Sequence, residues 1–78
     1  PLSQYVDNAL LSTAKAWYWR VSPNYDSTIA ITGRLIAGFP SSTLLSDAYY
    51  WQGKGYFNLN DYSQAQTAFQ TSLTLESA

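Results

Sequence analysis

The residue types that could do chemistry in this chain are few, because its 78 residues include no Cys and no His. Their absence excludes disulfide bonds, zinc sites of the usual Cys/His kind, and nucleophiles that are activated by histidine. Serine, lysine and carboxylate chemistry remain, and each needs a partner at a defined spacing.

One such spacing joins Ser12 to Lys15, since a lysine one helical turn away could activate the serine. The S-D-N and K-T-G elements that accompany this arrangement in serine enzymes are absent. A glycine pair surrounds Lys54, but Gly53-Lys54-Gly55 lacks the longer pattern that cradles a phosphate. We therefore interpret Ser12 and Lys15 as solvated helix residues, and Gly53-Lys54-Gly55 as a packing element.

The carboxylates are isolated along the chain, and no pair has the spacing of a metal-binding loop: Asp7, Asp26, Asp47, Asp61 and Glu76. General acid-base chemistry would need two of them at one site. We therefore predict no enzymatic activity, no catalytic residue, no metal and no cofactor.

The charge pattern excludes two further classes of partner. The net charge is −1, and Lys15, Arg20, Arg34 and Lys54 stand singly, so the sequence offers no basic patch for nucleic acid. No apolar run approaches the roughly 18 to 20 residues of a spanning helix, which argues against direct membrane insertion. A protein partner remains.

The composition also bears on location. Charged residues make up 12% of the chain, against about 25% in an ordinary domain, while aromatic residues reach 17%. The surface must therefore consist largely of Ser, Thr, Asn, Gln and Tyr. This favours an extracellular or cell-envelope protein, with a cytoplasmic one as the alternative.

Breaks in the apolar pattern divide the chain into four segments of helical length, at residues 2–21, 27–39, 43–59 and 63–75. Apolar residues recur within each segment at spacings of three and four, which predicts helices. The loops are short, so neighbouring helices should be antiparallel. The caps expected for the second, third and fourth helices are Asp26 or Ser27, Ser42, and Asp61.

The two halves of the chain resemble each other. A shift of 37 residues places Tyr62 on Tyr25 and Gly53 on Ala16. Glycine inside a helix costs about 1 kcal/mol relative to alanine, and close approach of a neighbouring helix is the usual compensation. We therefore predict two antiparallel helical hairpins of similar design, spaced by these small residues.

The stretch from Ala48 to Leu73 resembles a tetratricopeptide repeat (TPR). The matching positions are Tyr49, Gly53 and Tyr56, then the turn Leu59, Asp61 and Tyr62, then Ala65 and Phe69. The first half fits at Ser12, Ala16, Trp19, Tyr25 and Pro40, but it carries Thr28 and Thr32 where Ala and an aromatic are usual. The segment that joins the halves resembles the longer repeats of bacterial cell-envelope proteins, such as the periplasmic partner of the Tol-Pal system.

The resemblance implies an all-α, four-helix fragment of an α-solenoid that binds proteins. Residues 1–78 would form one domain, with repeat one at about 2–40 and repeat two at about 43–77. Its expected packing residues are Ala16, Tyr25, Tyr49, Gly53, Tyr56, Tyr62, Ala65 and Phe69.

Consecutive aromatic residues occur at 17–19 and 49–51, and successive helix residues cannot all face one side. They either cap the core of the hairpins or form an interface, in which Tyr, Trp and Arg are enriched. The interface interpretation predicts an aromatic groove of Trp17, Trp19, Arg20, Tyr50, Lys54 and Asn58. Only Lys54 and Asn58 fit the carboxylate clamp of TPR adaptors, so that peptide mode is not expected.

The second use of such an interface is self-assembly. Solenoid repeats normally need about three copies and polar caps at the ends, whereas this chain has two repeats and no cap. Its apolar ends are Leu2, Val6 and Leu10 on the first helix and Leu73 and Leu75 on the last. We predict head-to-tail stacking of copies into an oligomer or filament, with an adaptor for another protein or peptide as the alternative.

Overall fold

The computed structural model describes residues 2–20 and 24–77, with side chains described at 6–20 and 24–76. These described residues form four helices: α1 (Leu2–Tyr18), α2 (Tyr25–Gly38), α3 (Leu45–Asn58) and α4 (Tyr62–Ser77). The described residues contain no strand. The predicted all-α fold is thus confirmed, and the helix ends differ from the prediction by at most three residues. The predicted end of the first helix, Val21, lies outside the described residues.

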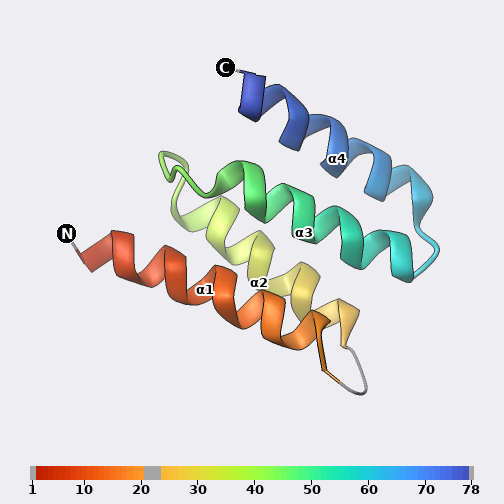
Figure 1. Cartoon of the computed structure of the whole chain (residues 1–78), viewed down its shortest axis with the longest axis horizontal. Helices are drawn as coiled ribbons and strands as arrows, with labels where there is room; N and C mark the ends of the chain where they lie inside the picture. The colour runs from red at the N-terminus through yellow and green to blue at the C-terminus, as the bar shows by residue number, and fades with distance from the viewer. Residues whose placement is uncertain (1, 21–23, 78) are drawn as a thin grey trace.

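The helices lie side by side in chain order, as Figure 1 shows, with α1 and α3 running one way and α2 and α4 the other. Each helix packs mainly on its neighbours in the chain, and α1 touches α3 only slightly. The molecule measures 36 × 28 × 16 Å, so it is about one and a half helix diameters thick in its shortest direction. This is the layout of an α-solenoid. No helix in the described part is long and apolar enough to cross a membrane.

The start of α2 differs from the prediction. Asn24 is the N-cap, and its side-chain oxygen accepts a hydrogen bond from the Ser27 amide at 3.0 Å. Asp26 and Ser27 therefore lie inside the first turn, because the helix begins at Tyr25. The carboxylate of Asp26 still stabilises the start of α2, since the N-terminus of a helix is positive.

The predicted caps of α3 and α4 have different outcomes. Ser42 Oγ accepts from the Leu44 amide at 3.0 Å, so it stabilises the turn before α3 rather than its first helical turn. Asp61 Oδ1 accepts from the Gln64 amide at 3.4 Å, as expected for the cap of α4. Asn60 before it has φ 66°, a left-handed conformation that Asn tolerates.

The main core lies between α1, α2 and α3. It consists of Leu11, Leu35 and Ala48, with five partly buried side chains packed against it: Leu10, Ile36, Leu44, Leu45 and Trp51. Leu10, which is predicted to belong to an open end of the molecule, is thus partly buried against this core. Leu10 turns into the core because it follows the buried stripe of α1 at helical spacing.

The contact between α1 and α2 is centred on Ala14 instead of Ala16. Ala14 is fully buried, and its carbonyl accepts a hydrogen bond from Thr28 Oγ1 at 3.0 Å. Ala16 is exposed, so its predicted packing role is wrong. Two residues correspond to a rotation of about 200°, which places these alanines on nearly opposite faces of the helix.

The contact between α3 and α4 is close and partly polar. A Cβ atom added at Gly53 would lie 2.8 Å from the ring of Phe69, so the glycine is what allows this ring to approach. Two reciprocal hydrogen bonds join α3 to α4. Ser72 Oγ donates to the Ser46 carbonyl at 2.8 Å, and Ser46 Oγ donates to the Ser72 carbonyl at 3.1 Å. Ala65, nearer the start of α4, is buried as well.

The tyrosines of the predicted packing set occupy different environments. Tyr25, Tyr49 and Tyr56 are half-buried, whereas Tyr62 is 57% exposed. The Tyr62 hydroxyl donates to Asn60 Oδ1 at 3.0 Å, and its ring meets Phe57 at 5.3 Å. Tyr62 therefore packs on the turn and not within the hairpin.

Candidate functional site

A cluster of aromatic rings surrounds one lysine where α1 ends beside α3. Lys54 Nζ lies 4.9 Å from the ring centre of Tyr18, 5.3 Å from Trp19, 5.5 Å from Tyr50 and 4.6 Å from Trp51. Each distance is within the range of a cation–π interaction. We call these five residues the Lys54 cluster.

The rings of the Lys54 cluster also contact one another. Tyr18 meets Trp51 edge-on at 5.3 Å, and Trp51 meets Trp19 and Tyr50, both at 5.9 Å. Edge-on aromatic pairs contribute roughly 0.5 to 1.5 kcal/mol beyond the area they bury. The cluster therefore ties α1 to α3, although Trp19 remains 67% exposed and Tyr50 45% exposed.

The structure brings together part of the predicted aromatic groove. Trp19, Tyr50 and Lys54 meet in the cluster, and Asn58 joins it because its Nδ2 donates to the Tyr18 hydroxyl at 3.0 Å. The other two predicted members lie elsewhere: the Arg20 guanidinium stacks on Trp17 at 4.5 Å.

Tyr18 and Trp51 belong to the aromatic runs noted in the sequence, but the predicted groove did not include them. Tyr18 continues the buried stripe of α1 that contains Asp7, Leu11 and Ala14, at spacings of four, three and four. That periodicity, followed to the end of the helix, would have identified it. Trp51 stands three residues before Lys54, so the two side chains are neighbours on one face of α3.

Two hollows lie next to the cluster. The first, of about 420 Å³, is lined by Tyr18, Tyr50, Lys54, Phe57, Asn58 and Phe69. The second runs along α4 with about 400 Å³, between Phe57, Tyr62 and Leu73. Phe69 lines both, so they adjoin.

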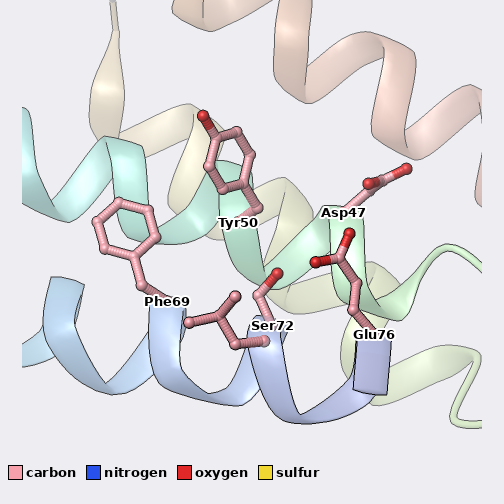
Figure 2. Close-up of a pocket in the computed structure, with 6 residues that line it drawn as sticks. Asp47, Tyr50, Phe69, Ser72 and Glu76 are labelled. Carbon is pink, nitrogen blue, oxygen red and sulfur yellow. The ribbon is translucent and has the colours of Figure 1, made fainter. Parts of the chain in front are cut away.

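A third hollow, which we call the α3/α4 groove, has a volume of about 530 Å³. Its lining residues are Asp47, Tyr50, Phe69, Ser72, Leu73 and Glu76. Figure 2 shows the rings of Tyr50 and Phe69 at one end and the carboxylates of Asp47 and Glu76 at the other. The groove is therefore aromatic at one end and acidic at the other.

Exposed apolar side chains accompany these hollows on α3, α4 and their turn: Phe57, Leu59, Tyr62, Leu73 and Leu75. Of the predicted end residues, Leu73 is 60% exposed, Leu75 38% and Val6 47%. The side chain of Leu2 lies outside the described residues. Adjoining apolar exposure of this kind is typical of a protein-binding surface.

The α3/α4 groove has a counterpart in the first hairpin. A shift of 37 residues relates Leu73 to Ile36, Ser72 to Leu35, and Asp47 to Leu10. Those three counterparts are covered: Leu35 is fully buried, and Leu10 and Ile36 pack against the core that α3 completes. In the second hairpin the corresponding positions line an open groove.

Charges in this region are poorly compensated. Asp47 and Glu76 form no ion pair with any residue that the structure describes, and the same is true of Lys54.

Asp7, on α1, is 6% exposed, and its Oδ2 accepts a hydrogen bond from Ser42 Oγ at 2.5 Å. Within the described part of the chain, no group of three or more acidic side chains could hold a metal ion.

Comparison with known proteins points to one family. Neither a protein-family model nor a solved structure matches the chain. A stretch of 47 residues, 60% of the chain, is 32% identical to tetratricopeptide repeat protein 1 of Schizosaccharomyces pombe, and it spans 4% of that protein. The similarity and the four-helix arrangement together support a TPR-like family for this chain and, in general terms, a role in protein interaction.

Proposed function

We propose that this chain is a non-enzymatic interaction module whose main partner is another copy of itself. Copies stack head to tail, with the α1 end of one molecule on the α3/α4 end of the next. The observation that carries the proposal is the open α3/α4 groove, whose counterpart in the first hairpin is covered by a helix of the same chain.

The energetics favour such stacking. A domain of this size buries only about 60 to 65% of the surface of its unfolded chain, so its own core provides limited stability. A stacked copy would cover Leu73, Leu75 and the ring of Phe69, and a specific interface of this type buries roughly 800 Å² per partner. The low charge content leaves little repulsion between copies.

The geometry of stacking determines the product. The two contacting surfaces lie on different helices, so the interface is heterologous and leaves each new end open. Such an interface builds a filament unless the rotation between copies closes a ring. We propose a structural role for the assembly, outside the cell or in the cell envelope, which includes the Tol-Pal-like setting that the sequence suggests.

Sedimentation velocity across a concentration series tests this function. The wild type should shift from monomer to larger species as its concentration rises. Leu73→Glu places a charge in the α3/α4 groove and should return the chain to monomer, whereas Thr67→Glu, at an exposed position of α4, should not. A wild type that remains monomeric at every concentration would overturn self-assembly.

The Lys54 cluster favours an adaptor as the second candidate. The adjoining 420 Å³ hollow combines rings with the Lys54 ammonium, a pairing that suits a peptide with an apolar and an acidic side chain. In this case the chain is a stable monomer, and Phe57→Ala, which removes a ring of this hollow that does not line the α3/α4 groove, abolishes binding of such a peptide while Thr67→Ala does not. Self-assembly that persists in Phe57→Ala, without peptide binding in the wild type, would exclude the adaptor.

A further inference from the structure

Building on the proposed function, we propose that the α3/α4 groove receives α1 of a second copy in one direction only. The incoming α1 runs parallel to α3. Its N-terminal end lies against Asp47 and Glu76, and its C-terminal end lies towards Lys54. Four observations lead to this polarity.

The first is the acidic end of the groove. Asp47 stands in the first turn of α3, and Glu76 stands in the last turn of α4, which contains no basic residue. The free carbonyl groups at the end of α4 and the free amide groups at the start of α3 lie at this same end and oppose each other, so the two carboxylates determine its negative charge. The N-terminus of a helix is positive and carries unpaired amide groups, so it complements this end.

The second is the position of Lys54 along the same surface. Lys54 presents an ammonium group that is held by rings and is not neutralised by any described carboxylate. Asp47 and Lys54 are seven residues apart, about 10 Å along α3, so Lys54 would lie beside the middle of the 17-residue α1. A helix that entered with its N-terminus at Asp47 would therefore keep its positive end away from the ammonium group.

The third is a precedent within the molecule. In the first hairpin the incoming helix is α3, which runs parallel to α1 (Figure 1). Its N-terminal side meets the carboxylate of Asp7 through Ser42, and farther along Lys15 Nζ lies 5.6 Å from the ring of Trp51. Acid at the start and lysine farther along is the same order that Asp47 and Lys54 present.

The fourth is shape, and it identifies the occupant as a second copy. α1 is the repeat counterpart of α3, and it exposes Ala9 and Ala16. The 37-residue shift relates these positions to Ser46 and Gly53, the small residues at which α3 receives α4. The exposed side of α1 is thus shaped for large side chains, which the groove supplies as Tyr50, Phe69 and Leu73.

Disulfide trapping between two different single-cysteine variants tests the polarity, because the chain has no cysteine of its own. Val6 and Thr13 lie on one exposed face of α1, about 10 Å apart along the helix. A disulfide needs Cα atoms within roughly 4.4 to 6.8 Å, so one partner cysteine cannot serve both positions in a single arrangement. Val6→Cys mixed with Leu73→Cys should give the crosslinked dimer, and Thr13→Cys mixed with Leu73→Cys should give at least tenfold less.

The other outcomes of the trapping experiment would each overturn a different part of the proposal. Preference for Thr13→Cys would overturn the polarity while leaving self-assembly in place. No crosslink from either mixture, with a wild type that still sediments as an oligomer, would overturn the groove as the docking site. No crosslink and a monomeric wild type would overturn the proposed function itself.

Charge removal gives an independent readout. The double variant Asp47→Asn, Glu76→Gln keeps side-chain shape and should weaken association roughly three- to thirtyfold, an effect that shrinks as salt rises. Asp26→Asn removes a first-turn carboxylate from α2 and serves as the matched control. Equal association of the double variant and the control would show that the acidic end does not select the incoming helix.

Discussion

Gly53 sets the distance between the two helices of the second hairpin. A side chain at this position meets the ring of Phe69, which itself lines the α3/α4 groove. The cost of a glycine inside a helix, about 1 kcal/mol, is thus offset by the packing of a large ring against the backbone. The groove depends on this ring position.

Gly53→Leu should therefore destabilise the fold by roughly 1 to 3 kcal/mol through overpacking. Urea unfolding of the variant and the wild type measures the difference. Gly38→Leu is the matched control, because no atom lies within 4 Å of a Cβ added at Gly38. Equal losses in both variants would remove Gly53 from the helix contact.

Ala14 and Ala16 of α1 offer a second comparison of single residues. Ala14→Leu adds three carbons at a fully buried position and should lower the melting temperature by several degrees. Ala16→Leu adds the same atoms at an exposed position and should change the stability of the monomer by less than about 0.5 kcal/mol. Dilute samples keep the species monomeric, and a larger loss for Ala16→Leu would contradict the orientation of α1.

At the scale of elements, the joint between α1 and α2 depends on a buried hydroxyl. Thr28→Val keeps the side-chain shape but removes the hydrogen bond to the Ala14 carbonyl, so we expect a loss of about 1 kcal/mol in urea unfolding. Thr67→Val removes an exposed hydroxyl that bonds only within α4 and should cost less than half as much. Similar losses would mean that the buried bond contributes nothing specific.

The elements themselves were predictable from the sequence, because helical spacing and turn residues are local signals. All four helices appear where the apolar periodicity predicts them, and Asp61 caps α4 as expected. The sequence does not single out Asn24 as the cap, because Asp26 and Ser27, which are also suitable cap residues, stand two and three positions after it. Which of these residues caps the helix can be decided only once the first residue of the helix is known.

The rotation of α1 about its own axis, which decides which of its side chains are buried, was not predictable in this way. The repeat alignment placed Ala16 at the contact by analogy with Gly53, yet Ala14 is buried and Ala16 is exposed. The first hairpin carries Thr28 and Thr32 where the TPR pattern has other residues, and Thr28 bonds to Ala14. The repeat pattern therefore does not determine the rotation of α1, and the face that buries Ala14 also places Leu10 against the core and Tyr18 in the Lys54 cluster.

At the scale of the whole molecule, the layout provides one covered and one open helix-docking surface. The four helices form a thin layer in which α3 completes the core of the first hairpin, while the α3/α4 groove is left open. Stacking would give each copy the neighbour that its second hairpin lacks. Stability and assembly should then be one equilibrium, because a partner that binds only the folded state stabilises it by mass action.

The thermal unfolding midpoint, measured over at least a hundredfold range of protein concentration, tests this claim most directly. We predict that the midpoint of the wild type rises steadily with concentration, and that the midpoint of Leu73→Glu does not. A wild-type midpoint that is the same at every concentration would contradict head-to-tail stacking.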